Sequence, residues 1–211
     1  MSIGHASAMT LTFGRAPRRS PPEFGWRKLD GPDDELAFVL AIPVAATLCL
    51  ALVVAWILAT PWSSFVVDQA RLLAALAIAV PVHELLRVAA FPRKPERHWL
   101  RFVCTKSRLA LDTGFDGELP RARLLCVLAA PFLLGSVLPV ALCAALRIAP
   151  DFAVLVTLTN ALLCGADALA LMLVLAQVPG RRLVRVDADV IRWQTSLPAT
   201  PARVGGARFA R

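Results

Sequence analysis

Charged residues are scarce in this 211-residue chain, where Asp, Glu, Lys and Arg make up 18% against 57% hydrophobic residues. Soluble domains carry about 25% charged and about 45–50% apolar residues. A disordered chain, a coiled coil and a disulfide-stapled secreted module are excluded on the same grounds. The chain has no Gly-rich phosphate loop. It also has no C-x-x-C pair, and we interpret its five cysteines as reduced. An integral membrane protein remains.

Apolar residues fall in long runs. A bilayer core of roughly 30 Å needs about 20 helical residues to cross it. Runs of at least this length cover residues 36–60, 72–91, 124–146 and 152–178. We therefore predict an all-α integral membrane protein with four transmembrane helices, and the lipid bilayer is its first predicted partner.

Basic residues are distributed unevenly between the connections. Of the 23 Lys and Arg residues, five precede the first span, eight lie in residues 92–123 and seven follow residue 178. This is the positive-inside pattern, and it predicts cytoplasmic termini and a cytoplasmic middle loop in a bacterial inner membrane. The net charge of +8 is thereby explained by topology, and no nucleic-acid partner is predicted. The same residues favour contact with anionic lipid headgroups.

The predicted organisation has three parts. Residues 1–35 form a cytoplasmic tail, residues 36–193 a four-span membrane domain, and residues 194–211 a disordered tail. Apolar and polar residues alternate in 98–111 and 183–193, as in short β-strands. We expect these two segments to pair as a small cap on the cytoplasmic face of the helices.

Ionisable residues inside two spans are the most informative feature. The second span contains His83, Glu84 and Arg87, and the fourth contains Asp167. A charged residue at a helix centre costs roughly 2.5–3.5 kcal/mol, so such residues face the bundle interior and find partners there. His83 lies about 12 Å and Asp167 about 16 Å from the cytoplasmic helix ends, which predicts a shared site.

The spacing around this site is typical of a metal centre with one change. His83-Glu84-x-x-Arg87 differs in its last residue from H-E-x-x-H, in which two histidines bind zinc and the Glu activates water. A guanidinium has no lone pair to donate, so Arg87 cannot bind zinc. Ion pairs of Arg87 with Asp167 or Glu84 are predicted to fill the space. Asn160 and Cys164 share a helix face with Asp167.

With these residues, the chain resembles the "Putative zincin peptidase" family, small multi-span proteins similar in plan to site-2-protease-like metalloproteases. The shared elements are Pro81 before His-Glu, the Phe91-Pro92 exit, Ala130-Pro131-Phe132, and Asn160 followed by Asp167. The resemblance covers roughly residues 36–193. It implies that His83 and Asp167 bind zinc and that Glu84 is the general base of a peptidase.

Several interpretations stay open at this point. The polar residues could be a satisfied buried cluster that fixes helix packing, or a metal-free site for substrate, proton or lipid. Alternatively, zinc is retained with Cys164 or His98 in place of the missing histidine, Cys164 being the better candidate. We favour an inactive homologue that acts by binding or scaffolding a membrane-protein partner. The alternative is an active zinc-dependent intramembrane or juxtamembrane metallopeptidase with a membrane-protein substrate.

Overall fold

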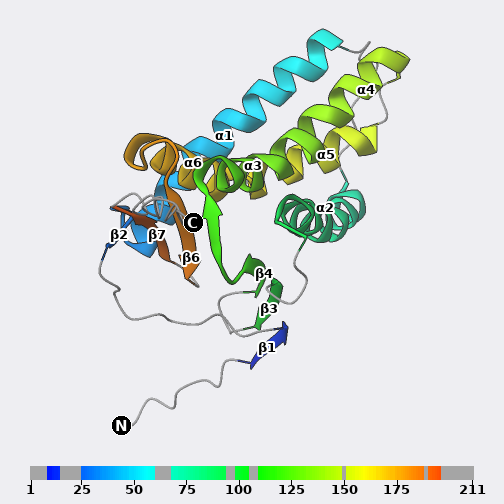
Figure 1. Ribbon diagram of the computed structural model, residues 1–211. Coiled ribbons are helices and arrows are strands. Elements are labelled where there is room, and N and C mark those ends of the chain that lie inside the picture. Colours follow the sequence, from blue (N-terminus) through cyan, green and yellow to red (C-terminus); the bar gives the residue numbers. More distant parts are fainter. Residues whose placement is uncertain are drawn as a thin grey trace, which may run out of the picture.

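A computed structural model gives the fold (Figure 1). The residues it describes are 9–14, 25–59, 68–93, 98–104, 109–148, 151–187 and 190–195. Most of them are helical, which agrees with the predicted fold class. The predicted disordered C-terminal tail lies, from residue 196 on, outside the described residues.

Each predicted span corresponds to helix. Two are continuous, α1 (Asp34–Ala59) and α2 (Gln69–Ala90). The third consists of α3 (Arg121–Phe132), a π-helical turn η2 (Leu133–Val137) and α4 (Leu138–Leu146). The fourth is broken at Cys164 into α5 (Asp151–Leu163) and α6 (Gly165–Gln177), which meet at a bend of 47°.

These helices are compatible with a membrane protein. Three stretches are long and apolar enough to cross a bilayer, and the bent α5–α6 pair would be a fourth if it counts as one span. Large apolar side chains of α1 point outward, with Phe38 71%, Leu50 65% and Leu58 82% exposed. Exposed apolar surface of this kind is unfavourable in water, whereas lipid tails would cover it.

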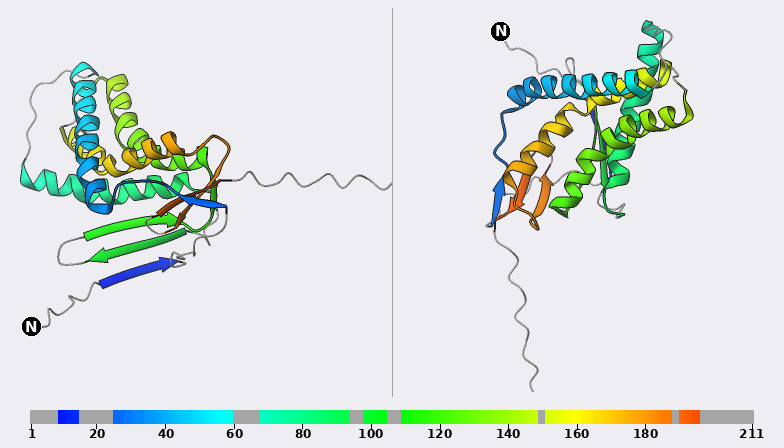
Figure 2. Two further views of the ribbon diagram at one scale, coloured as in Figure 1. Left: turned by 90° about the vertical axis from the view of Figure 1, so that its left-hand side faces the viewer. Right: turned by 90° about the horizontal axis from the view of Figure 1, so that it is seen from above.

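The broken helix pair α5–α6 lies at the centre of the bundle. It packs against α1 along both halves, while α5 contacts α2 and α6 contacts α3. Figure 2 shows in its left panel that α2 runs across the direction of α1. Residues from α2 and from the bend in α5–α6 therefore meet inside the bundle.

Short strands form two separate antiparallel sheets. One has the order β1-β3-β4 and the other the order β2-β7-β6-β5. The strands are β1 (Met9–Gly14), β2 (Trp26–Lys28), β3 (His98–Cys104), β4 (Leu109–Phe115), β5 (Glu118–Pro120), β6 (Leu183–Asp187) and β7 (Val190–Gln194). Figure 2 shows the first sheet beside α2, and β4 contacts that helix.

Strands were predicted at 98–111 and 183–193, and both segments do contain them. Their predicted pairing with each other is wrong, because each segment forms its own hairpin, β3–β4 and β6–β7. The remaining strands come from other parts of the chain. β1 and β2, from the predicted N-terminal tail, pair with β3 and β7, and β5, which follows β4 in the sequence, pairs with β6. A hairpin closes with a short loop, which costs less entropy than pairing segments far apart in the sequence.

Candidate functional site

Four ionisable side chains meet between α2 and α6. We call His83, Glu84, Arg87 and Asp167 the charged cluster. Residue exposure is 4% for His83, 8% for Glu84 and 4% for Asp167, and the Arg87 side chain is 18% exposed. The predicted shared site of the second and fourth spans is therefore present as a spatial cluster.

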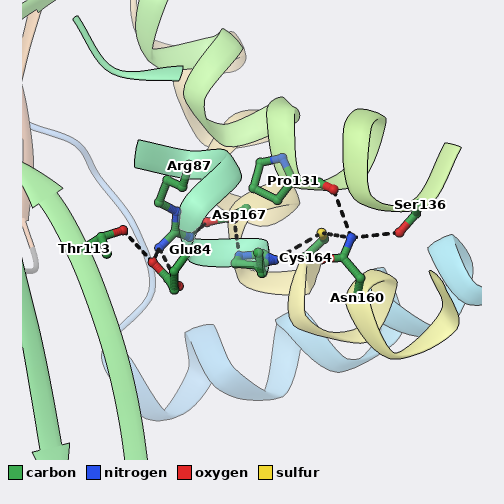
Figure 3. Close-up of polar contacts among 9 residues, drawn as sticks. Glu84, Arg87, Thr113, Pro131, Ser136, Asn160, Cys164 and Asp167 are labelled. Atoms are coloured by element: carbon green, nitrogen blue, oxygen red, sulfur yellow. Dashed lines mark hydrogen bonds and ion pairs between the residues drawn. The ribbon is translucent and has the colours of Figure 1, made fainter. Parts of the chain in front are cut away.

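Arg87 bridges the two carboxylates of the cluster. Its Nη1 lies 3.4 Å from both carboxylate oxygens of Glu84, and its Nη2 donates a hydrogen bond to Oδ1 of Asp167. Figure 3 shows the guanidinium between the two acidic side chains. Both ion pairs predicted for Arg87 are thus formed at once, the one with Glu84 within α2 and the one with Asp167 between helices.

Glu84 has a further partner from outside the helices. The Thr113 hydroxyl, on β4, donates a hydrogen bond to Oε2 of Glu84 (Figure 3). The next residue, Gly114, lies under the ring of Trp99, where an added Cβ would be 2.1 Å from a ring carbon. A residue without a side chain is therefore needed for the sheet to hold Thr113 at this place. Both carboxylate oxygens of Glu84 have donors.

Asn160 determines which His83 nitrogen carries a proton. Its Nδ2 donates to the Pro131 carbonyl at 2.9 Å and to Oγ of Ser136 at 2.8 Å. Because a carbonyl oxygen can only accept, this orientation turns Oδ1 of Asn160 toward His83, 3.3 Å from Nδ1. Nδ1 therefore carries a hydrogen.

The other imidazole nitrogen faces Asp167. Nε2 of His83 lies 3.2 Å from Oδ2 of Asp167, and this oxygen accepts no hydrogen bond of standard geometry from the described residues. Nε2 of His83 and Oδ2 of Asp167 therefore face each other between α2 and α6.

Asn160 is itself held by an unusual stretch of helix. Pro131 is the penultimate residue of α3, and Ser136 lies in the π-helical turn η2, where Leu138 bonds to Leu133 five residues back. Oγ of Ser136 donates in turn to the Thr157 carbonyl at 3.0 Å. π-turns occur often at functional sites, and this one positions the groups around Asn160. Figure 3 shows Asn160 in contact with Pro131, Ser136 and Cys164.

The bend between α5 and α6 brings Asp167 toward α2. At the bend, Gly165 packs so closely on α1 that an added Cβ would be 2.7 Å from the Ala41 carbonyl oxygen and 2.8 Å from Cβ of Ala45. A small residue at an interhelical contact permits this approach. The predicted shared face of Asn160, Cys164 and Asp167 survives the bend, since all three contact His83.

Cys164 and His98, the two candidates to replace the missing zinc-binding histidine, do not lie beside Nε2 of His83. The thiol of Cys164 is 3.7 Å from Nδ1, on the opposite side of the imidazole from Asp167. His98 contacts the Pro92 carbonyl at 2.9 Å and packs edge-on against Phe115. Neither side chain joins the pair of Nε2 and Oδ2 in this structure.

These residues do not fit a zinc ion. A catalytic zinc takes three protein ligands, and here His83 and Asp167 supply two. The side chain next to them is Arg87, which is cationic and bonded to the carboxylate that zinc would need. Across the described ranges, no three His, Cys, Asp or Glu side chains form a group that could hold a metal ion.

Sequence reasoning missed two contributors to the site. Thr113 stands in a strand with nothing in its surroundings to connect it to Glu84, and Ser136 lies in a span where the π-turn was not predicted. The one available signal for Ser136 was a polar residue in an apolar run close to Pro131. For Thr113 the sequence offers no comparable signal.

The family comparison agrees with this site. Residues 76–183, about half of the chain, match the family model described as "Putative zincin peptidase". The chain belongs to this family. The matched segment contains the entire charged cluster together with Asn160, so the family relation applies to these residues directly. No curated protein and no solved structure matches the chain.

Proposed function

We propose that this chain is a non-catalytic member of the zincin peptidase family that acts in the bacterial inner membrane by binding or scaffolding other membrane proteins. One observation carries the proposal: Arg87 pairs with both Glu84 and Asp167. In an active zincin, a zinc ion would polarise the scissile carbonyl, and the Glu would be free to activate water. Here that Glu is held by Arg87 and Thr113.

Three structural consequences support a binding role. Side chains of the charged cluster and Thr113 connect α2, α6 and β4 directly to one another. The outward side of α1 exposes large apolar side chains to lipid or to another membrane helix. Cytoplasmic termini, as the positive-inside pattern predicts, would place both sheets on the side where cytoplasmic partners are available.

The test is the zinc content of the protein purified in detergent without a metal-affinity tag. We expect the wild type to carry well below one zinc per chain and Arg87→His to approach one, because residue 87 lies one helical turn from His83. Adding Asp167→Ala to Arg87→His should remove the zinc again. Circular dichroism and gel filtration would show that each variant is folded.

A specific observation keeps the active peptidase as a second candidate. Nδ1 of His83 donates to Asn160, which leaves Nε2 directed at Asp167, the arrangement by which an outer hydrogen bond orients a metal-binding histidine. Near-stoichiometric zinc in the wild type, lost in both His83→Ala and Asp167→Ala, would overturn the non-catalytic proposal and establish the metallopeptidase as the better one.

A further inference from the structure

An apolar groove runs along the outside of α3 and α6, away from the charged cluster. Its volume is about 460 Å³, within the range of about 300–1,000 Å³ usual for ligand pockets. Its lining consists of Leu125, Cys126, Ala129, Ala130, Leu133, Leu134, Leu171 and Leu175. Ala129 and Ala130 make room for the groove, because their side chains are smaller than the leucine and cysteine side chains that form the rest of its lining.

The length of the groove matches one lipid leaflet. From Leu125 to Leu134 it extends about 13 Å along the helix axis, close to half of the roughly 30 Å hydrocarbon core. These residues belong to the third candidate span, which begins at Arg121. The groove therefore starts about one helical turn from the end of the span and runs inward.

Two arginines stand at this end of the groove. Nη2 of Arg121 contacts the carbonyl of Leu175, a groove residue, at 3.1 Å. The backbone N–H of Arg121 donates to the carbonyl of Arg182 at 3.0 Å, so the two residues are direct neighbours. Nε of Arg121 and Nη1 of Arg182 are buried and have no hydrogen-bond partner among the described residues.

The charges around Arg121 and Arg182 favour binding of an anion. Among the residues that the structure describes, neither Arg121 nor Arg182 forms an ion pair, and the nearby Glu118 is bonded to Arg185. The first turn of α3 holds no acidic residue, and Pro120 gives it no side-chain cap, so the positive end of the helix dipole adds to the same field. Buried guanidinium donors without acceptors are costly.

We propose that this groove is a binding site for an anionic phospholipid. One acyl chain lies between α3 and α6 over Ala129 and Ala130, and the phosphate accepts hydrogen bonds from Arg121 and Arg182. Guanidinium groups bind phosphate with charge-assisted hydrogen bonds, and a basic pocket at a membrane helix end is suited to an anionic headgroup. This site is independent of the charged cluster and of whether the protein binds zinc.

Native mass spectrometry of the detergent-purified chain tests the proposal with phosphatidylglycerol and phosphatidylcholine of identical acyl chains. We expect phosphatidylglycerol to bind at least ten-fold more tightly. The double variant Arg121→Gln/Arg182→Gln should weaken its binding by about 30-fold, while Arg121→Lys/Arg182→Lys retains most of it. Ala129→Leu/Ala130→Leu should abolish retention by filling the groove.

Matched controls use similar residues outside the groove. Arg147→Gln removes an arginine at the far end of the third span, and Ala145→Leu enlarges an exposed alanine of α4; both should bind phosphatidylglycerol like the wild type. Equal binding of the two lipids would overturn the proposal, and so would unchanged binding in Arg121→Gln/Arg182→Gln or in Ala129→Leu/Ala130→Leu. So would a dimer without lipid that the alanine variants dissociate, since a second copy would then be the occupant.

Discussion

Replacing Arg87 by alanine is the sharpest test of how the charged cluster holds the bundle together. The Arg87 side chain is 18% exposed, and its partners Glu84 and Asp167 are 11% and 6% exposed. Removing one partner from buried ion pairs leaves uncompensated charge and typically costs about 3–5 kcal/mol. We expect Arg87→Ala to lose stability of this size, because two carboxylates lose their shared cation.

Arg71 provides a matched control on the same helix. Its ion pair with Asp68, the residue before α2, is also an (i, i+3) contact, but the two side chains are 46% and 48% exposed. Exposed pairs contribute about 0–1 kcal/mol, so Arg71→Ala should be nearly silent. Thermal unfolding of both variants in the same detergent, followed by circular dichroism, gives the comparison directly.

A second substitution separates lost charge balance from lost packing. If the cost of Arg87→Ala comes from unpaired carboxylates, adding Asp167→Asn should recover part of it, because one buried charge is then removed. If it comes from the cavity left by the side chain, the second change should add to the loss. Our reasoning is refuted if Arg87→Ala unfolds at the same temperature as Arg71→Ala, or if Asp167→Asn brings no recovery.

Two further substitutions test the surroundings of the cluster. Asn160→Ala removes the buried hydrogen bonds to the Pro131 carbonyl and to Nδ1 of His83 and should cost about 2–4 kcal/mol, measured by unfolding. Thr159→Ala, which loses a bond within its own helix, should cost under about 1 kcal/mol. Gly165→Ala should destabilise the protein by about 1–3 kcal/mol, because the added Cβ would collide with α1. Gly31→Ala is the control, since its added Cβ would lie 3.7 Å from the nearest side-chain atom. Equal stability of the two variants would contradict the close approach of Gly165 to α1.

The helical part of the fold was predictable because a bilayer demands long apolar runs. The predicted span 72–91 differs little from α2, which starts earlier because Asp68 accepts a hydrogen bond from the Arg71 amide. The break at Cys164 was not predictable, since Gly165 reads in sequence as a small packing residue. The close contact of Gly165 with α1 at the bend becomes visible once the bundle is assembled.

Strand pairing and the neutral residues of the site could not be predicted from the sequence, because both depend on contacts between distant segments. Alternation of apolar and polar residues locates strands but does not specify their partners, so the separate β3–β4 and β6–β7 hairpins could not be derived from it. Ionisable residues inside a membrane span cost free energy unless they have partners. On this ground every member of the charged cluster was predicted from the sequence. Neutral partners such as Thr113 and Ser136 carry no such cost and stayed hidden.

Charge balance explains how the fold can accommodate Arg87. In the zinc arrangement that the family resemblance implies, a divalent ion offsets Glu84 and Asp167 while His83 is neutral. In this structure Arg87 supplies a positive charge that Glu84 and Asp167 share. Both arrangements place positive charge beside the same buried carboxylates. Under the proposed non-catalytic function, Arg87 occupies the position of the second histidine of H-E-x-x-H and supplies part of the positive charge that a metal ion would bring to these two carboxylates.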